Sequence, residues 1–253
     1  MNQEPLVTCV MLVDGRTEMV KRAIASYVDQ TYARKRLLIY DTGETALANV
    51  LPGVATGSAG VQYWRGPSGE RRSIGALRNI ANGHAATDVF AHWDSDDWSA
   101  PDRLAVQVAA LVVSGCDVVG FHDVLFWSTE RSAQDVDVRH EGAHLSYREA
   151  RCFGQAWTYT ALHPDGVIGA SLLYRRQVWE RRTFPDRNAG EDTLWLMRQR
   201  NVYPLPSIVR PAPRMVCEIH GANTASKIDA GKREWRRAPE HDRYCNEVMK
   251  LGT

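Results

Sequence analysis

The sequence lacks the features that mark zinc-binding, disulfide-linked and nucleic-acid-binding proteins. Its 253 residues include five widely spaced cysteines and no C-x-x-C pair, which argues against a zinc knuckle and a disulfide framework. Thirty-one basic residues balance 30 acidic ones, so the net charge of +1 provides no field to attract nucleic acid. We therefore expect reduced thiols, a cytoplasmic location and no nucleic-acid partner.

Long apolar segments are also missing. The first apolar run, residues 6–13, is broken by Asp14 and is far shorter than the ~20 residues that cross a bilayer. Glu4 lies where a secretory signal would carry basic residues. We expect neither a membrane span nor a secretory signal.

Both glycine-rich phosphate-binding motifs are absent. No G-x-G-x-x-G follows the first apolar run, and no G-x-x-x-x-G-K-[S/T] occurs anywhere in the chain. These absences disfavour a dinucleotide site and a P-loop. The negative charge of a bound diphosphate would need to be neutralised in another way, and a metal ion held by carboxylates is the obvious way.

What the first half does contain is an alternation of strand and helix patterns. Apolar runs at residues 6–13, 37–41, 61–64 and 88–93 predict buried strands. Helical spacing of apolar residues predicts helices at 18–30 and 73–86, and Thr17 is placed to cap the first. Short links between such elements indicate an α/β fold with a parallel central sheet.

Aspartates follow these strands. Asp14, Asp41 and Asp94 each come at the carboxyl end of a predicted strand, where ligands bind in parallel α/β sheets. Asp96 and Asp97 follow two and three residues after Asp94, in the sequence DSDDWSAPDR. This convergence makes the first half of the chain a candidate for nucleotide binding.

The cluster of Asp94, Asp96 and Asp97 has two interpretations that the residues alone leave open. One is a solvated turn, which suits the turn preference of Asp and the dipole of the helix that follows. The other is a D-x-D site, in which carboxylates at a strand end hold Mn²⁺ or Mg²⁺ and leave positions for diphosphate oxygens. The turn explains less well why the charges follow a buried strand at the ligand-binding edge.

In the order of its motifs, the chain resembles the family 2 type of inverting glycosyltransferases. The segments that carry the resemblance are LVTCVMLVDGR, RAIASYVDQTY, LLIYDTG, SIGALRNIANGHAATDVFAHWDSDDWSAPDRL, GASLLYRRQVW and GEDTLWLMR. They span roughly the first 200 residues, if motif order reflects shared folding units. The resemblance implies a GT-A (Rossmann-like) fold, with a mostly parallel central sheet flanked by helices and a smaller acceptor-side region.

The resemblance also implies roles for residues on the acceptor side. Asp192, in GEDTLWLMR, would be the general base that takes a proton from an acceptor hydroxyl. Glu191 beside it and Trp157 are further acceptor-side candidates. Taken alone, Glu191 and Asp192 equally suit the first turn of a helix, and Trp157 equally suits a satellite core.

On the donor side the resemblance implies a nucleotide-sugar site and a metal site. Asp41 would contact the nucleotide base. A late histidine is often brought over the diphosphate in related enzymes, although a lone histidine more often has a loop or core role. The nucleotide-sugar candidates are Asp14, Asp41, Arg78 and Asp94, and the metal candidates are Asp94, Asp96, Asp97 and His220.

Two segments depart from the family pattern. The family usually has Pro-Thr-Tyr-Asn after its first strand, where this chain has Leu12 to Gly15, and often has Asp-Asp-Gly-Ser at the second, where this chain has Tyr40 to Gly43. Both segments border the base pocket. They leave the nucleotide, and with it the donor sugar, open.

We therefore expect a metal-dependent inverting glycosyltransferase of the hexosyltransferase type, which moves a sugar from a nucleotide-diphosphate sugar to an acceptor hydroxyl. One domain would cover residues 1–225, with a nucleotide-sugar half at 1–115 and an acceptor and catalytic half at 116–225. Residues 226–253 would form a charged tail or helix. The alternative is a catalytically inactive relative that binds a nucleotide sugar or a protein, but such a module needs no base at Asp192.

Overall fold

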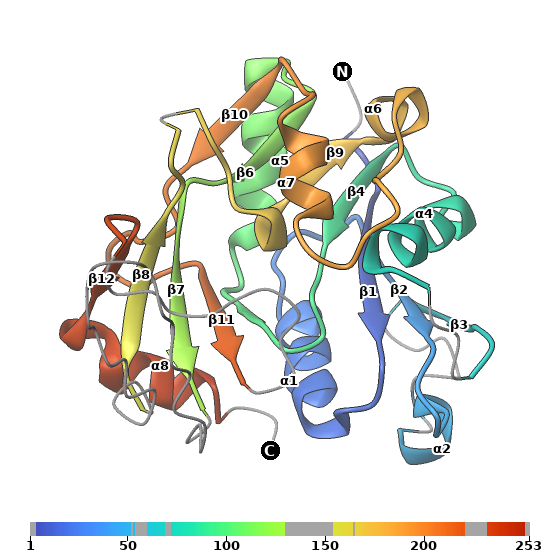
Figure 1. Cartoon of the computed structure of the whole chain (residues 1–253), viewed down its shortest axis with the longest axis horizontal. Coiled ribbons are helices and arrows are strands. Elements are labelled where there is room, and N and C mark those ends of the chain that lie inside the picture. The colour runs from blue at the N-terminus through green and yellow to red at the C-terminus, as the bar shows by residue number, and fades with distance from the viewer. Residues whose placement is uncertain are drawn as a thin grey trace, which may run out of the picture.

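A mixed seven-stranded sheet forms the centre of the described part of the chain (Figure 1). The computed structural model describes residues 4–51, 53, 60–68, 72–129, 154–163, 165–220 and 232–250. The strand order is β10 (Val202–Leu205), β6 (Val118–Phe121), β9 (Leu173–Arg175), β4 (Val89–His92), β1 (Val7–Val13), β2 (Lys35–Asp41) and β3 (Val61–Arg65).

Most neighbours in this sheet are parallel. β1 pairs in parallel with β2 and β4, β2 with β3, and β10 with β6, whereas β9 runs antiparallel to β4 and β6. The predicted mostly parallel sheet is confirmed. Because β1, β2 and β4 point the same way, their carboxyl ends meet at one edge, and the aspartates that follow them lie there.

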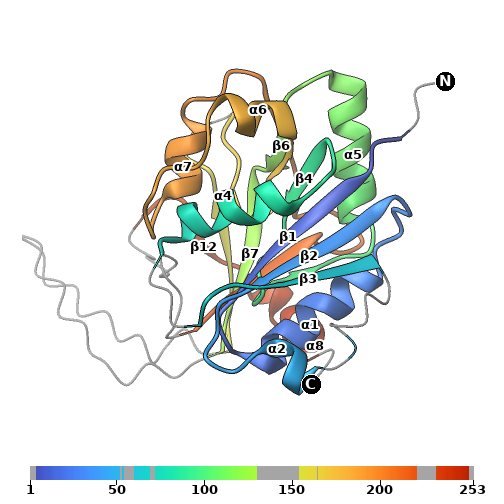
Figure 2. The same cartoon turned by 90° about the vertical axis from the view of Figure 1, so that its right-hand side faces the viewer.

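Helices cover both faces of the main sheet (Figure 2). Alternate residues of β1 contact different helices, since successive side chains of a strand point to opposite faces. On one face Val7, Cys9 and Met11 pack in a cluster with α1 (Thr17–Val28) and α5 (Arg103–Ser114). On the other, Val10 packs in a cluster with α4 (Ile74–His84), α6 (Arg176–Arg181) and α7 (Glu191–Leu196).

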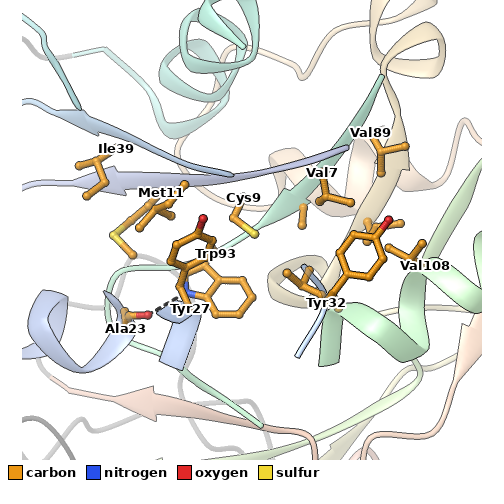
Figure 3. Close-up of a cluster of buried hydrophobic side chains, with 14 of the residues drawn as sticks. Val7, Cys9, Met11, Ala23, Tyr27, Tyr32, Ile39, Val89, Trp93 and Val108 are labelled. Atoms are coloured by element: carbon orange, nitrogen blue, oxygen red, sulfur yellow. Dashed lines mark hydrogen bonds between the residues drawn. The ribbon is translucent and has the colours of Figure 1, made fainter. Parts of the chain in front are cut away.

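Trp93 anchors the end of β4 in the first of these clusters (Figure 3). Its indole Nε1 donates to the carbonyl of Ala23 in α1 at 2.9 Å, and the ring meets Tyr27 edge to face. The Arg103 guanidinium lies 4.8 Å from the centroid of the same ring. The residue just before the aspartate cluster is therefore fixed from both helices of this face.

A smaller second sheet lies beside the first (Figure 1). Its strand order is β12 (Trp235–Arg237), β8 (Ala156–Thr160), β7 (Asp123–Ser128), β11 (Met215–Ile219) and β5 (Trp98–Ser99). β5 begins directly after Asp97, so the aspartate cluster connects the two sheets. The smaller region that the resemblance implies beside the main sheet is thus present, and its service to an acceptor stays a prediction.

The C-terminal segment is part of the second sheet. β12 pairs antiparallel with β8, and α8 (Asp242–Val248) contributes Cys245 and Val248 to the buried cluster that contains Trp98. Trp235 finds apolar companions in Phe126 and Tyr159, which come from other strands. Residues 232–250 of the expected tail are thus packed into the fold, and residues 226–231 and 251–253 lie outside the described residues.

None of the helices in the described part of the chain combines the length and the apolar character that a bilayer span requires.

A buried ion pair holds α1 to β11 below the aspartate cluster. Arg22 donates to the carboxylate of Glu218, and both residues are under 5% exposed. The same guanidinium donates to the carbonyl of Asp96 at 2.6 Å and to that of Met249 at 3.0 Å. One buried cation therefore fixes the aspartate segment, β11 and the end of α8 together.

We expect Glu218→Gln to lower the free energy of unfolding by about 3–5 kcal/mol, because it leaves the Arg22 charge buried without its counter-charge. Urea unfolding measures the difference. Asp102→Asn is the control. It breaks a pair with Arg214, and the Asp102 side chain in that pair is 50% exposed. That variant is expected to lose less than about 1 kcal/mol. Equal losses in the two variants would contradict the structural role of the buried pair.

Candidate active site

A cleft of about 630 Å³ opens at the carboxyl edge of the main sheet. Its walls come from the ends of β1 and β2, the segment after β4, the 3₁₀ turn η3 (Gly169–Ser171), the start of α7 and β11. The sequence-predicted residues that line it are Asp14, Arg78, Asp94, Asp96, Asp97, Glu191 and Asp192. The structure therefore brings candidates from both halves of the chain into one cleft.

Arg78 joins the two sides of this cleft. Its Nη2 donates to Asp94 Oδ1 at 3.2 Å, and its Nε donates to Glu191 Oε1 at 3.3 Å. Burial alone would lower the pKa of Arg78, but these carboxylates raise it above its usual value. Burial raises the pKa of both Asp94 and Glu191, although the charge of Arg78 opposes the rise. Within the described residues, the buried Nη1 of Arg78 has no hydrogen-bond partner.

Asp96 has a different set of partners. Its Oδ2 lies 3.0 Å from His220 Nε2, at the end of β11, and 3.6 Å from Arg16 Nη1, at the start of α1. Arg16 Nη1 is also 3.3 Å from His220 Nε2. Burial raises the pKa of Asp96, but the His220 hydrogen bond and the Arg16 charge bring it below its usual value.

Asp97 is bonded to the second sheet. It is 7% exposed, and its Oδ1 accepts a hydrogen bond from the Glu218 backbone N–H at 3.1 Å. Burial, followed by the charges of Asp96 and Asp94, raises the pKa of Asp97 well above its usual value. This aspartate fixes the cluster to β11, a role that sequence spacing could not separate from metal binding.

Asp41 is fully buried at the end of β2. Its carboxylate accepts hydrogen bonds from the backbone N–H groups of Gly43 and Leu47, at 2.9 and 2.8 Å, and from the Tyr63 hydroxyl at 2.6 Å. It orders the loop that brings Thr42 to the cleft wall, and Asp41 itself does not line the cleft. The predicted contact with a nucleotide base stays a prediction.

Asp192 lies at the start of α7, directly against Gly169. Its Oδ1 accepts a hydrogen bond from the Thr193 N–H at 2.6 Å. A Cβ atom on residue 169 would lie 1.4 Å from Asp192 Oδ2, so only glycine leaves room for the carboxylate. His92 Nδ1 lies 2.8 Å from the Gly169 carbonyl and holds the turn from below. Gly169 is a site residue that sequence reasoning missed, because one glycine in GASLLYRRQVW gives no signal of what it faces.

Trp157 lies outside the cleft lining. It packs on the cluster formed by Phe126, Cys217 and Trp235 in the second sheet. Its indole Nε1 is buried and has no hydrogen-bond partner among the described residues. Phe126 and Cys217 themselves line the cleft, so Trp157 lies behind its wall, and its acceptor-side role remains a prediction.

The family model described as "Glycosyl transferase family 2" matches residues 8–182, more than half of the chain. The chain belongs to glycosyl transferase family 2. The family predicted from the motifs is therefore confirmed. Among curated proteins, no relative matches.

Solved glycosyltransferase structures share the fold of this family member at low sequence identity. Staphylococcus aureus TarS 1–349 matches with a TM-score of 0.60 at 13% identity, over 84% of this chain and 60% of that one. The mannosyltransferase PcManGT from Pyrobaculum calidifontis, in complex with GDP-Man and Mn²⁺, matches with a TM-score of 0.56 at 16% identity. The match covers 86% of this chain and 57% of that one. TarS 1–349 in complex with UDP-GlcNAc matches with a TM-score of 0.57 at 14% identity, over 86% of this chain and 60% of that one.

The chain spans about 60% of the length of these TarS structures. At such identities the likeness shows the fold, and the predicted GT-A fold is confirmed.

Two predicted metal ligands lie in direct contact, Asp96, which lines the cleft, and the buried His220, which is not among the lining residues. No three His, Cys, Asp or Glu side chains in the described ranges form a complete metal site. Asp96 Oδ2 and His220 Nε2 are 3.0 Å apart, however. Adjacent ligands of an octahedral ion bound at about 2.1 Å have about that spacing. Mg²⁺ usually takes one or two protein carboxylates and completes its shell with substrate phosphates and water, and neutral imidazole is a common metal ligand.

The Arg78 bridge makes a prediction about pH. Arg78→Met removes the cation that lowers the pKa of Asp94 and Glu191, so both carboxyl groups hold protons still more tightly in the folded state. A folded-state pKa above the unfolded value favours folding as the pH falls. We expect the variant to lose about 3 kcal/mol of unfolding free energy near pH 8, where both groups are charged, and to recover much of it near pH 5.

Urea unfolding of variant and wild type at the two pH values measures this difference. Arg214→Met, which removes a partly exposed arginine from its pair with Asp102, is the control and should show little pH dependence. A loss in Arg78→Met that is the same at both pH values would rule out the charge bridge as its cause.

Proposed function

We propose that this protein is a metal-dependent inverting glycosyltransferase, which moves a sugar from a nucleotide-diphosphate sugar to an acceptor hydroxyl. One observation carries the proposal: Asp94 and Asp96 share a cleft with Asp192, and Arg78 is bonded to carboxylates on both sides of it. The cleft volume is in the range of small-molecule sites, ~300–1,000 Å³. Displacement of a diphosphate requires a metal ion beside the leaving group and a general base beside the attacking hydroxyl, on opposite walls of the cleft.

Asp96 and His220 would hold Mn²⁺ or Mg²⁺. Such an ion, when bound, neutralises the charge that develops on a diphosphate leaving group. The complex of PcManGT with GDP-Man and Mn²⁺ supports this part of the proposal, as does the UDP-GlcNAc complex of TarS for the class of donor. Asp14 and Thr42, at the ends of β1 and β2, line the cleft where a nucleoside would lie.

Asp192 would act as the general base. It takes the proton of the acceptor hydroxyl as that oxygen bonds to the anomeric carbon, while the bond from that carbon to the diphosphate oxygen breaks on the opposite side. Attack from opposite the leaving group inverts the configuration. The Thr193 N–H holds Oδ1, and Gly169 leaves the room that Oδ2 occupies. General-base help of this kind contributes roughly 10²–10⁴ in rate.

The test is release of nucleoside diphosphate from a panel of UDP-, GDP- and dTDP-sugars with Mn²⁺, using water as the acceptor. We expect Asp192→Asn to lower turnover by roughly 10²-fold or more without weakening donor binding, because Asn cannot take the proton. Gly169→Ala should cause a similar loss, since the new Cβ displaces the Asp192 carboxylate.

Two matched variants serve as controls. Gly83→Ala adds a Cβ in α4 that meets nothing within 4 Å, and Asp186→Asn changes an exposed aspartate that bonds Ser73. Both should keep wild-type turnover. Full activity in Asp192→Asn would refute the base assignment. Donor binding without turnover in the wild type would instead identify a catalytically inactive relative.

A further inference from the structure

Arg16 has an unusual backbone conformation at the edge of the cleft. Its φ of 57° and ψ of 50° lie in the left-handed region, and it is the one non-glycine residue with positive φ in the described ranges. It occupies the N-cap of α1 without a side-chain capping bond, while Thr17, predicted to cap this helix, is the first helical residue. A residue with a Cβ pays a conformational cost there, and such strain concentrates at functional sites.

This conformation brings a guanidinium to the two side chains that fit a metal. Arg16 Nη1 is 3.6 Å from Asp96 Oδ2 and 3.3 Å from His220 Nε2, and the same side chain lines the cleft. A divalent ion bound by these two atoms would lie close to the guanidinium, and the two cations would repel strongly in a partly buried site. Arg16 and a divalent ion therefore compete for the Asp96–His220 pair.

The Arg16 contact is built differently from the buried pair beneath it. Arg22 is bonded to the Glu218 carboxylate and to two backbone carbonyls and is almost fully buried. The Arg16 side chain is 31% exposed and approaches Asp96 with a single nitrogen at 3.6 Å. A contact of that geometry is weak and exchangeable, so it suits a side chain that changes partner.

We propose that Arg16 is the resident counter-ion of Asp96 and a hydrogen-bond donor to His220, and that it exchanges with the divalent cation. When the ion takes these two ligands, the guanidinium turns into the cleft and binds the diphosphate of the donor, a group that arginine holds with paired hydrogen bonds. This inference rests on the proposed function and adds a donor-binding residue to it. Arg16 thus stabilises the aspartate cluster without metal and the donor with it.

The first experiment is titration with Mn²⁺ alone, followed by the loss of the electron paramagnetic resonance signal of free Mn²⁺. Arg16→Asn removes the charge and keeps a residue that tolerates the left-handed conformation. We expect it to bind Mn²⁺ roughly tenfold more tightly than the wild type, because the competing cation is gone. Arg181→Asn, which breaks an exposed one-nitrogen pair with Asp117 at 3.5 Å, is the matched control and should leave Mn²⁺ affinity unchanged.

The second experiment titrates UDP and GDP at saturating Mn²⁺. Arg16→Asn should weaken binding of the preferred diphosphate roughly tenfold, whereas Arg16→Lys should recover part of it. Equal Mn²⁺ affinity in Arg16→Asn and wild type, weaker affinity in the variant, or no binding by either would overturn the exchange. In those cases, turnover of the donor by the wild type would still support the proposed function. Absence of turnover alongside tighter Mn²⁺ binding in Arg16→Asn would contradict the proposed function instead.

Discussion

Three aspartates within four residues, at the buried end of one strand, repel one another, and the cleft is arranged so that each has a different partner. Asp94 is paired with Arg78, Asp96 with His220 and Arg16, and Asp97 accepts a backbone N–H of β11. Together these contacts bring α4, the start of α1 and β11 to the edge of the sheet. The charge of the cluster therefore organises the cleft.

The supports of the cluster differ in how firmly they hold. Trp93 on one side and the Arg22–Glu218 pair below are buried and bonded on several sides. Arg16 and Asp96 are partly exposed and meet through one nitrogen. Under the proposed exchange, the buried contacts keep the carboxylates in position while the partner of Asp96 changes. That division is what a site needs when its charge balance differs between the empty and the substrate-bound states.

Much of the main sheet follows from local pattern. The apolar run at residues 6–13 predicts β1 within one residue, and the aspartates at strand ends do gather at one edge. The second sheet could not be derived this way, because β11 pairs with β7 and β12 with β8 across long stretches of chain. The sequence also could not distinguish the separate roles of Asp94, Asp96 and Asp97, or show the importance of Gly169. Only tertiary contacts distinguish these residues.

The most direct test of a metal-dependent nucleotide-sugar site is chemical unfolding with UDP, GDP, dTDP and CDP, each with Mn²⁺ or with EDTA. A ligand present at 100 times its dissociation constant adds about 2.7 kcal/mol to the free energy of unfolding. We expect at least one diphosphate to stabilise the protein with Mn²⁺, and EDTA or Asp96→Ala to abolish the effect. Stabilisation that survives both, or no response to any diphosphate, would contradict a metal-dependent nucleotide-sugar site.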